Sequence, residues 1–80
     1  MPRRAPRSVH SVRYKTLLTR LKAARKKANL TQVQVATALG KQQSYVSKCE
    51  SGERRMDPID LADFARLYRQ PVGHFLDGLT

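Results

Sequence analysis

Apolar side chains recur every three or four residues along the first third of the chain, beginning at Tyr14. Lysine and arginine fill many of the positions between them, so one face of a helix would be apolar and the other basic. The apolar positions are Tyr14, Leu17, Leu18, Leu21, Ala24 and Ala28. The pattern predicts an amphipathic helix that ends at Asn29, because asparagine tolerates the left-handed conformation found at helix ends.

Two shorter helical patterns follow, one on either side of Gly40. Thr31 predicts the start of the first, because its hydroxyl can accept a hydrogen bond from a free amide of the opening turn. The inward positions of this helix are Val35, Ala36 and Leu39. Gly40 suits the left-handed residue that closes a helix and redirects the chain.

The helix predicted from about Gln42 to residue 50 has an apolar side and a polar side. Val46 and Cys49 lie on the apolar side, three residues apart. The exposed side carries mainly hydrogen-bonding groups, those of Gln43, Ser44, Ser47 and Lys48. Two short helices joined by a glycine turn predict a helix-turn-helix, and the polar face of its second helix suits the edges of DNA bases.

The last third of the chain predicts two more helices. Asp57 can cap the first of them, and Pro58 suits its opening position because proline has no amide to leave unpaired. The inward positions of that helix are Leu61, Phe64, Ala65 and Tyr68. Pro71 begins a short fifth helix, in which we expect His74 to pack or to lie in an interface rather than bind a metal. The expected fold is all-α, with five short helices and no sheet.

This arrangement resembles the Cro/CI-like (XRE) helix-turn-helix family, the phage-repressor type, over roughly residues 14 to 77. The residues that carry the resemblance are Leu30, Thr31, Gln32, Val35, Ala36, Leu39, Gly40, Gln43, Ser44, Val46, Ser47, Glu50 and Gly52. The sequence departs from the family at Gln42, where a serine or threonine cap is usual, and at Cys49, where a larger residue is common. The resemblance implies a phage-repressor-like DNA-binding domain whose second motif helix enters the major groove.

Gln43 is the first candidate for base reading, because its side-chain amide can form two hydrogen bonds with adenine. Ser44, Ser47 and Lys48 share its face, and Gln42 is a further candidate because it stands at the start of the same helix. A thiol buried in a core is ordinary packing, so Cys49 is not expected to act as a redox sensor.

Candidate phosphate contacts flank the predicted reading helix. The resemblance implies a contact at Gln32, which with Thr31 lies at the start of the preceding helix, where free amides attract anions. Arg54 and Arg55, in the loop that follows the reading helix, are expected to meet the DNA backbone farther along. The resemblance also implies an ion pair between Arg25 and Glu50, an acid near the negative end of its helix.

The charge of the chain is unevenly distributed. The formal net charge is +10, but residues 1–30 hold ten basic residues and no acid, whereas residues 31–80 hold six of each. Residues 1–13 contain few apolar side chains and are predicted to form a disordered arm, which includes His10. Its arginines, Arg3, Arg4, Arg7 and Arg13, are expected to contact phosphates, with a narrow minor groove as the alternative for the first three.

Length and composition limit the other possibilities. Eighty residues form a single small domain, here residues 14–77, with a short tail at residues 78–80. The single cysteine cannot form an internal disulfide, and no metal site, cofactor motif or catalytic constellation is present. The chain shows neither a signal peptide nor a membrane span, so a cytoplasmic protein that is not an enzyme is expected.

The main hypothesis is a homodimeric transcriptional regulator that represses by binding a palindromic operator in double-stranded DNA. Apolar residues near the C-terminus, Val72, Phe75, Leu76 and Leu79, either pair across a two-fold axis or belong to the core of one copy. Two alternatives stay open. One is a protein-interaction module, such as an antitoxin that binds a toxin or a factor that bridges to the transcription machinery, and the other is a basic binder of RNA or DNA without sequence preference.

Overall fold

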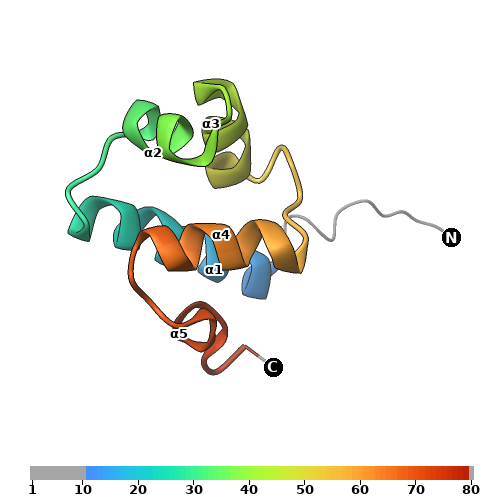
Figure 1. The fold of residues 1–80 in the computed structure, drawn as a ribbon. Coiled ribbons are helices and arrows are strands. Elements are labelled where there is room, and N and C mark those ends of the chain that lie inside the picture. Colours follow the sequence, from blue (N-terminus) through green and yellow to red (C-terminus); the bar gives the residue numbers. More distant parts are fainter. Residues whose placement is uncertain (1–10, 80) are drawn as a thin grey trace, which may run out of the picture.

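The computed structural model describes residues 11–79, which form five α-helices and no strand. The helices are α1 (Val12–Lys27), α2 (Gln32–Leu39), α3 (Gln43–Ser51), α4 (Pro58–Leu67) and α5 (Val72–Leu76). Helices α2 and α3 lie together above α1 and α4, and α5 lies below them (Figure 1). The predicted all-α fold with five short helices is confirmed. No helix in this part of the chain has both the length and the apolar character needed to cross a membrane.

Reciprocal capping sets the starts of α2 and α4. The Thr31 hydroxyl accepts a hydrogen bond from the Gln34 amide (3.1 Å), and the Gln34 side chain accepts one from the Thr31 amide (2.9 Å). Asp57 and Asp60 make the same exchange at α4, with distances of 2.8 and 3.0 Å. Each pair satisfies two amides that a helix start leaves free, so both helices begin where the sequence predicts.

Helix α1 begins two residues before the predicted start at Tyr14. Its cap is Ser11, whose hydroxyl accepts a hydrogen bond from the Tyr14 amide at 3.1 Å. The first helical residue, Val12, is 80% exposed, so it adds nothing to the apolar stripe that predicted the helix. Arg13 therefore lies on α1 and not in an arm. The other arm residues, Arg3, Arg4, Arg7 and His10, lie outside the described residues.

Four helices end at a left-handed residue. These residues are Asn29 (φ 63°), Gly40 (φ 69°), Gly52 (φ 87°) and Arg69 (φ 58°). At Asn29, Gly40 and Arg69 the amide of the next residue donates to a carbonyl five residues earlier, at 2.9 to 3.2 Å, which satisfies an end carbonyl of the helix. The ends at Asn29 and Gly40 follow the sequence prediction, whereas an arginine in this conformation carried no signal.

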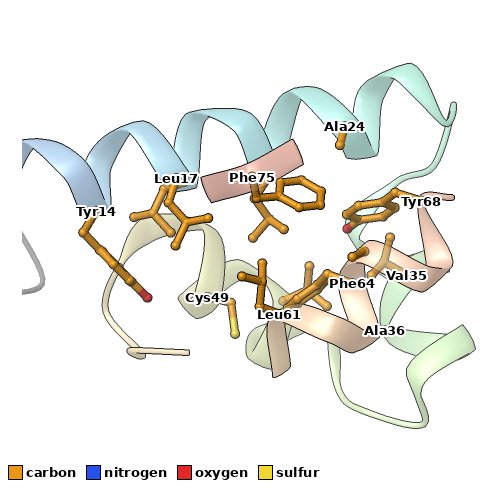
Figure 2. Packing of buried hydrophobic residues seen from close by; sticks show 14 residues of the cluster. Tyr14, Leu17, Ala24, Val35, Ala36, Cys49, Leu61, Phe64, Tyr68 and Phe75 are labelled. Atoms are coloured by element: carbon orange, nitrogen blue, oxygen red, sulfur yellow. The ribbon is translucent and has the colours of Figure 1, made fainter. Parts of the chain in front are cut away.

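One core joins all five helices. Its largest fully buried side chains are Phe64, Phe75, Leu21, Val35, Val46 and Cys49. Phe75 reaches from α5 into the space between α1 and α4 (Figure 2). A side chain with no exposed surface cannot pair with a second copy, so Phe75 belongs to the core of one copy. His74 is exposed and places its ring edge-on to Phe75, with 5.1 Å between ring centres.

Two arginines of α1 hold the C-terminal segment. Arg20 donates to the carbonyls of Phe75 (3.3 Å) and Asp77 (2.7 Å). Arg13 donates to the carbonyl of Leu79 at 3.0 Å. These bonds satisfy carbonyls at and beyond the end of α5, a helix of only five residues.

Candidate nucleic-acid interface

Helix α3 turns its polar side to solvent and its apolar side to the core, as the spacing predicts. Gln43, Ser44 and Lys48 are exposed, whereas Ser47 is half-buried. Gln42 is the exposed cap residue of α3, but its side chain forms no capping hydrogen bond. The exposed side chains available to a ligand are therefore mostly neutral groups that donate and accept hydrogen bonds.

A row of polar contacts connects Gln43 with the interior. The Gln43 side-chain amide donates to Gln32 Oε1 at 2.7 Å. Gln32 in turn donates to Glu50 Oε1 at 3.0 Å. Glu50 lies at the end of α3 and Gln32 at the start of α2, so the row fixes the two motif helices relative to each other at their polar surface.

Arg25 and Glu50 form an ion pair with two contacts. Arg25 Nε lies 2.6 Å from Glu50 Oε2, and Nη2 lies 3.2 Å from Oε1. Arg25 also donates to the Leu30 carbonyl at 2.9 Å. Hydrogen bonding to Glu50 raises the pKa of Arg25 above its ordinary value. Glu50 is only 4% exposed, so this pair is an internal link between α1 and α3 and is not a pair of surface charges.

Tyr45 organises a second group of polar contacts, where α3 meets the start of α4. Its hydroxyl donates to Asp60 Oδ1 at 3.0 Å, and its ring stacks on Phe64 with 6.1 Å between centres. Lys41 and Arg54 each place their charged group 5.1 Å from the centre of the Tyr45 ring. The aromatic ring thus holds two cations beside the helix-turn-helix, a role that the sequence pattern did not reveal.

The Asp60 carboxylate accepts two hydrogen bonds and lies beside a cationic side chain. Burial raises the pKa of its carboxyl, but hydrogen bonds from the Asp57 amide and the Tyr45 hydroxyl, together with the charge of Arg54, lower it below the ordinary value. Arg54 Nη2 lies 3.8 Å from Asp60 Oδ2. Burial and the hydrogen bond to Asp60 raise the pKa of Tyr45, so its hydroxyl keeps the proton that it donates.

The two arginines of the α3–α4 loop point to different places. Arg54 lies over Tyr45 with its side chain half-exposed, beside the motif. Arg55 lies over the ring of Tyr14 in α1, with its guanidinium 4.5 Å from the ring centre. The structure therefore separates these two predicted phosphate contacts, and Arg54 is the one next to α3.

Two observations concern groups that commonly take part in catalysis. Among residues 11–79 no three His, Cys, Asp or Glu side chains gather where they could hold a metal ion. Cys49 is fully buried, and burial raises the pKa of its thiol. A buried, protonated thiol is a poor nucleophile, which fits its packing position.

Comparison with known proteins agrees with this geometry. A family model described as a helix-turn-helix domain matches residues 16–74. The chain is similar to a solved structure described as an XRE-family like protein from Pseudomonas syringae pv. tomato str. DC3000. The two share 42% sequence identity with a TM-score of 0.78, and the match covers 90% of each chain. No curated protein matches the sequence.

Proposed function

This chain belongs to the XRE-type helix-turn-helix family of DNA-binding regulators, and we propose that it reads the major groove of double-stranded DNA with α3. The observation that carries the proposal is the hydrogen bond between Gln43 and Gln32. It holds the candidate reading side chain in one orientation at the exposed edge of the motif.

The hydrogen-bonding capacity of Gln43 supports base reading. A glutamine amide has two N–H donors and one carbonyl acceptor. One donor is bonded to Gln32, which leaves one donor and the acceptor. Adenine presents N7, an acceptor, and the N6 amino group, a donor, in the major groove. The remaining groups of Gln43 are thus the complement of an adenine, and Ser44, Ser47, Lys48 and Gln42 are the proposed neighbouring contacts.

Phosphate contacts are proposed on both sides of α3. On one side are Thr31 and Gln32 at the start of α2, where helix amides attract anions. On the other side are Arg54 and Lys41, whose charged groups both lie 5.1 Å from the centre of the Tyr45 ring. Arg55, Arg13 and the arginines at positions 3, 4 and 7 are proposed as more distant phosphate contacts, and their charge adds affinity without sequence preference.

We further propose that two copies bind a palindromic operator and repress transcription by occupying it. Val72 is 38% exposed, and Leu76 and Leu79 beside it are half-buried. These residues belong to α5 and the segment just after it, which lie on the opposite side of the molecule from α3 (Figure 1). A contact there would join two copies and leave both reading helices free.

Selection of bound duplexes from a random pool tests the base-reading proposal. We expect the parent to enrich a defined motif. Gln43→Ala should cost roughly 1 to 3 kcal/mol on that motif and relax the preference at one base pair. The matched control is Gln70→Ala, which removes the same side chain between α4 and α5 and should leave affinity and preference unchanged. If Gln43→Ala retains the preference of the parent, base reading by Gln43 is wrong.

A further inference from the structure

We propose that the groove between α1 and α3 holds a strand of the DNA sugar–phosphate backbone, through Lys15, Lys22 and Lys26. This inference rests on the proposed function and extends the DNA contact from the reading helix to the first helix. None of these three lysines belongs to the helix-turn-helix motif.

The groove has a volume of about 530 Å³ and lies along one side of α1. It is lined by Lys15, Leu18, Thr19, Lys22, Ala23, Lys26 and Glu50. The lysines are spaced seven and four residues apart, which places them in one row on the helix. At 1.5 Å per residue the row extends about 16 Å along the helix.

The charge of the groove is positive and uncompensated. Its one acidic lining residue, Glu50, already bonds Arg25 and Gln32. Within residues 11–79, Lys15, Lys22 and Lys26 form no ion pair. Three of the arginines are paired with acids, and Arg13 and Arg20 are bonded to carbonyls. Lys27, Lys48 and Arg69 likewise form no ion pair among these residues, and the lysine row differs from them because its three members line one groove.

Hydrogen bonds link the wall of the groove to the proposed reading face. Glu50, which forms part of its wall, bonds Gln32, and Gln32 bonds Gln43. A phosphate at the start of α2 would thus lie near the groove, and the same strand can continue along α1. Leu18 and Ala23 provide an apolar floor, which suits deoxyribose, while the lysines at the rim suit the phosphates.

Two other roles for the lysine row would involve no bound DNA strand. It could be a solvated face that raises solubility and acts only through its long-range field. An acidic segment of a partner protein would also suit the charge. A field weakens gradually and is screened over about 10 Å at 0.1 M salt, so it depends less on the exact position of each charge than a backbone track does.

The test compares two variants that remove equal charge. Lys22→Gln/Lys26→Gln removes two cations from the groove, and Lys27→Gln/Arg69→Gln removes two exposed cations that do not line it. Binding to a mixed-sequence 30-base-pair duplex would be measured between 0.05 and 0.3 M salt. Lys22→Arg/Lys26→Arg keeps the charge in place, and circular dichroism confirms that each variant is folded.

We expect the groove variant to flatten the slope of log affinity against log salt by about 1.8, or roughly 60-fold in affinity per decade of salt. The control pair and the arginine pair should keep the slope of the parent. Equal flattening by the groove and control variants, or none in either, would overturn the backbone track. Sequence preference on the selected motif is measured in parallel. If the parent has that preference and the groove variant keeps the full slope, the track fails while the proposed function stands. If the parent shows no sequence preference, the proposed base-reading function is wrong, whatever slope the groove variant has.

Discussion

At the scale of single residues, Gly40 decides how α2 passes into α3. Its φ of 69° lies in the left-handed region, and a Cβ added there would meet no atom within 4 Å. Gly40→Ala should therefore lower the free energy of unfolding by about 1 kcal/mol through backbone strain alone. Urea denaturation followed by circular dichroism measures the change.

Gly73 is the control for this prediction, because a Cβ there also meets no atom within 4 Å. Gly73 lies inside α5 without a positive φ, so Gly73→Ala should raise the free energy of unfolding by up to about 1 kcal/mol. Changes of the same sign at the two glycines would show that something other than the left-handed conformation sets the cost.

At the scale of elements, Asp60 links the start of α4 to Tyr45 of α3 and to the loop at Arg54. Its pKa is lower in the folded chain than the unfolded value of about 3.9. A group with a lowered pKa stabilises the fold at pH values above its unfolded pKa, and this stabilisation is lost as the pH falls through the folded pKa.

Asp60→Asn should therefore be less stable than the parent at pH 7, and the difference should shrink as the pH falls below about 4. Urea unfolding at pH 7, 4 and 3 measures it. Asp63→Asn is the control, since Asp63 is half-exposed and pairs with Arg66 one turn away on the same helix. A difference between Asp60→Asn and the parent that does not change with pH would contradict the assigned role.

The ion pair between Arg25 and Glu50 joins α1 to α3. Removing one partner leaves the other charge buried, so Glu50→Ala should lower the free energy of unfolding by about 3 kcal/mol. Glu53→Ala is the matched control, because Glu53 is exposed and forms no ion pair within residues 11–79. Equal stability of Glu50→Ala and the parent in urea would show that the pair contributes nothing.

Local chemistry explains how well the elements were predicted. Thr31, Asp57 and Gly40 act on amides and carbonyls within a few residues, so the sequence shows where α2 ends and where α2 and α4 begin. The start of α1 was missed because Val12, although apolar, is exposed and does not belong to the buried stripe from which the helix was predicted. The capping residue Ser11 was the signal that could have shown it. The sequence therefore predicts a helix boundary well where capping residues close to that boundary determine it.

The contacts within the candidate site were predicted less well than the helix boundaries. The polar character of Gln43 and Gln32 follows from the pattern, but the hydrogen bond between them depends on how α2 and α3 pack across the turn. Tyr45 was not identified at all, because its partner Asp60 lies 15 residues away on another helix. Contacts of this kind follow from the tertiary arrangement, which helical periodicity does not define.

At the scale of the whole molecule, the proposed dimer gives a prediction about size. Sedimentation should show a dimer, in solution or on a selected duplex, and the two half-sites should lie about one helical turn apart. Val72→Lys should weaken this dimer by placing a charge in an apolar contact. Val33→Lys changes another exposed valine, on α2, and should not. A monomer both free and on DNA would remove the dimer from the proposal.

The attachment of α5 has a consequence for hydrogen exchange. Five residues are too few to keep a helix in water, so α5 exists only while Phe75 stays buried and Arg13 and Arg20 hold the carbonyls around it. Its amides should exchange with deuterium through a partial opening that leaves α2 and α3 folded. A second copy seated on α5 would slow that exchange, so the exchange rate of the α5 amides reports assembly without any measurement of DNA binding.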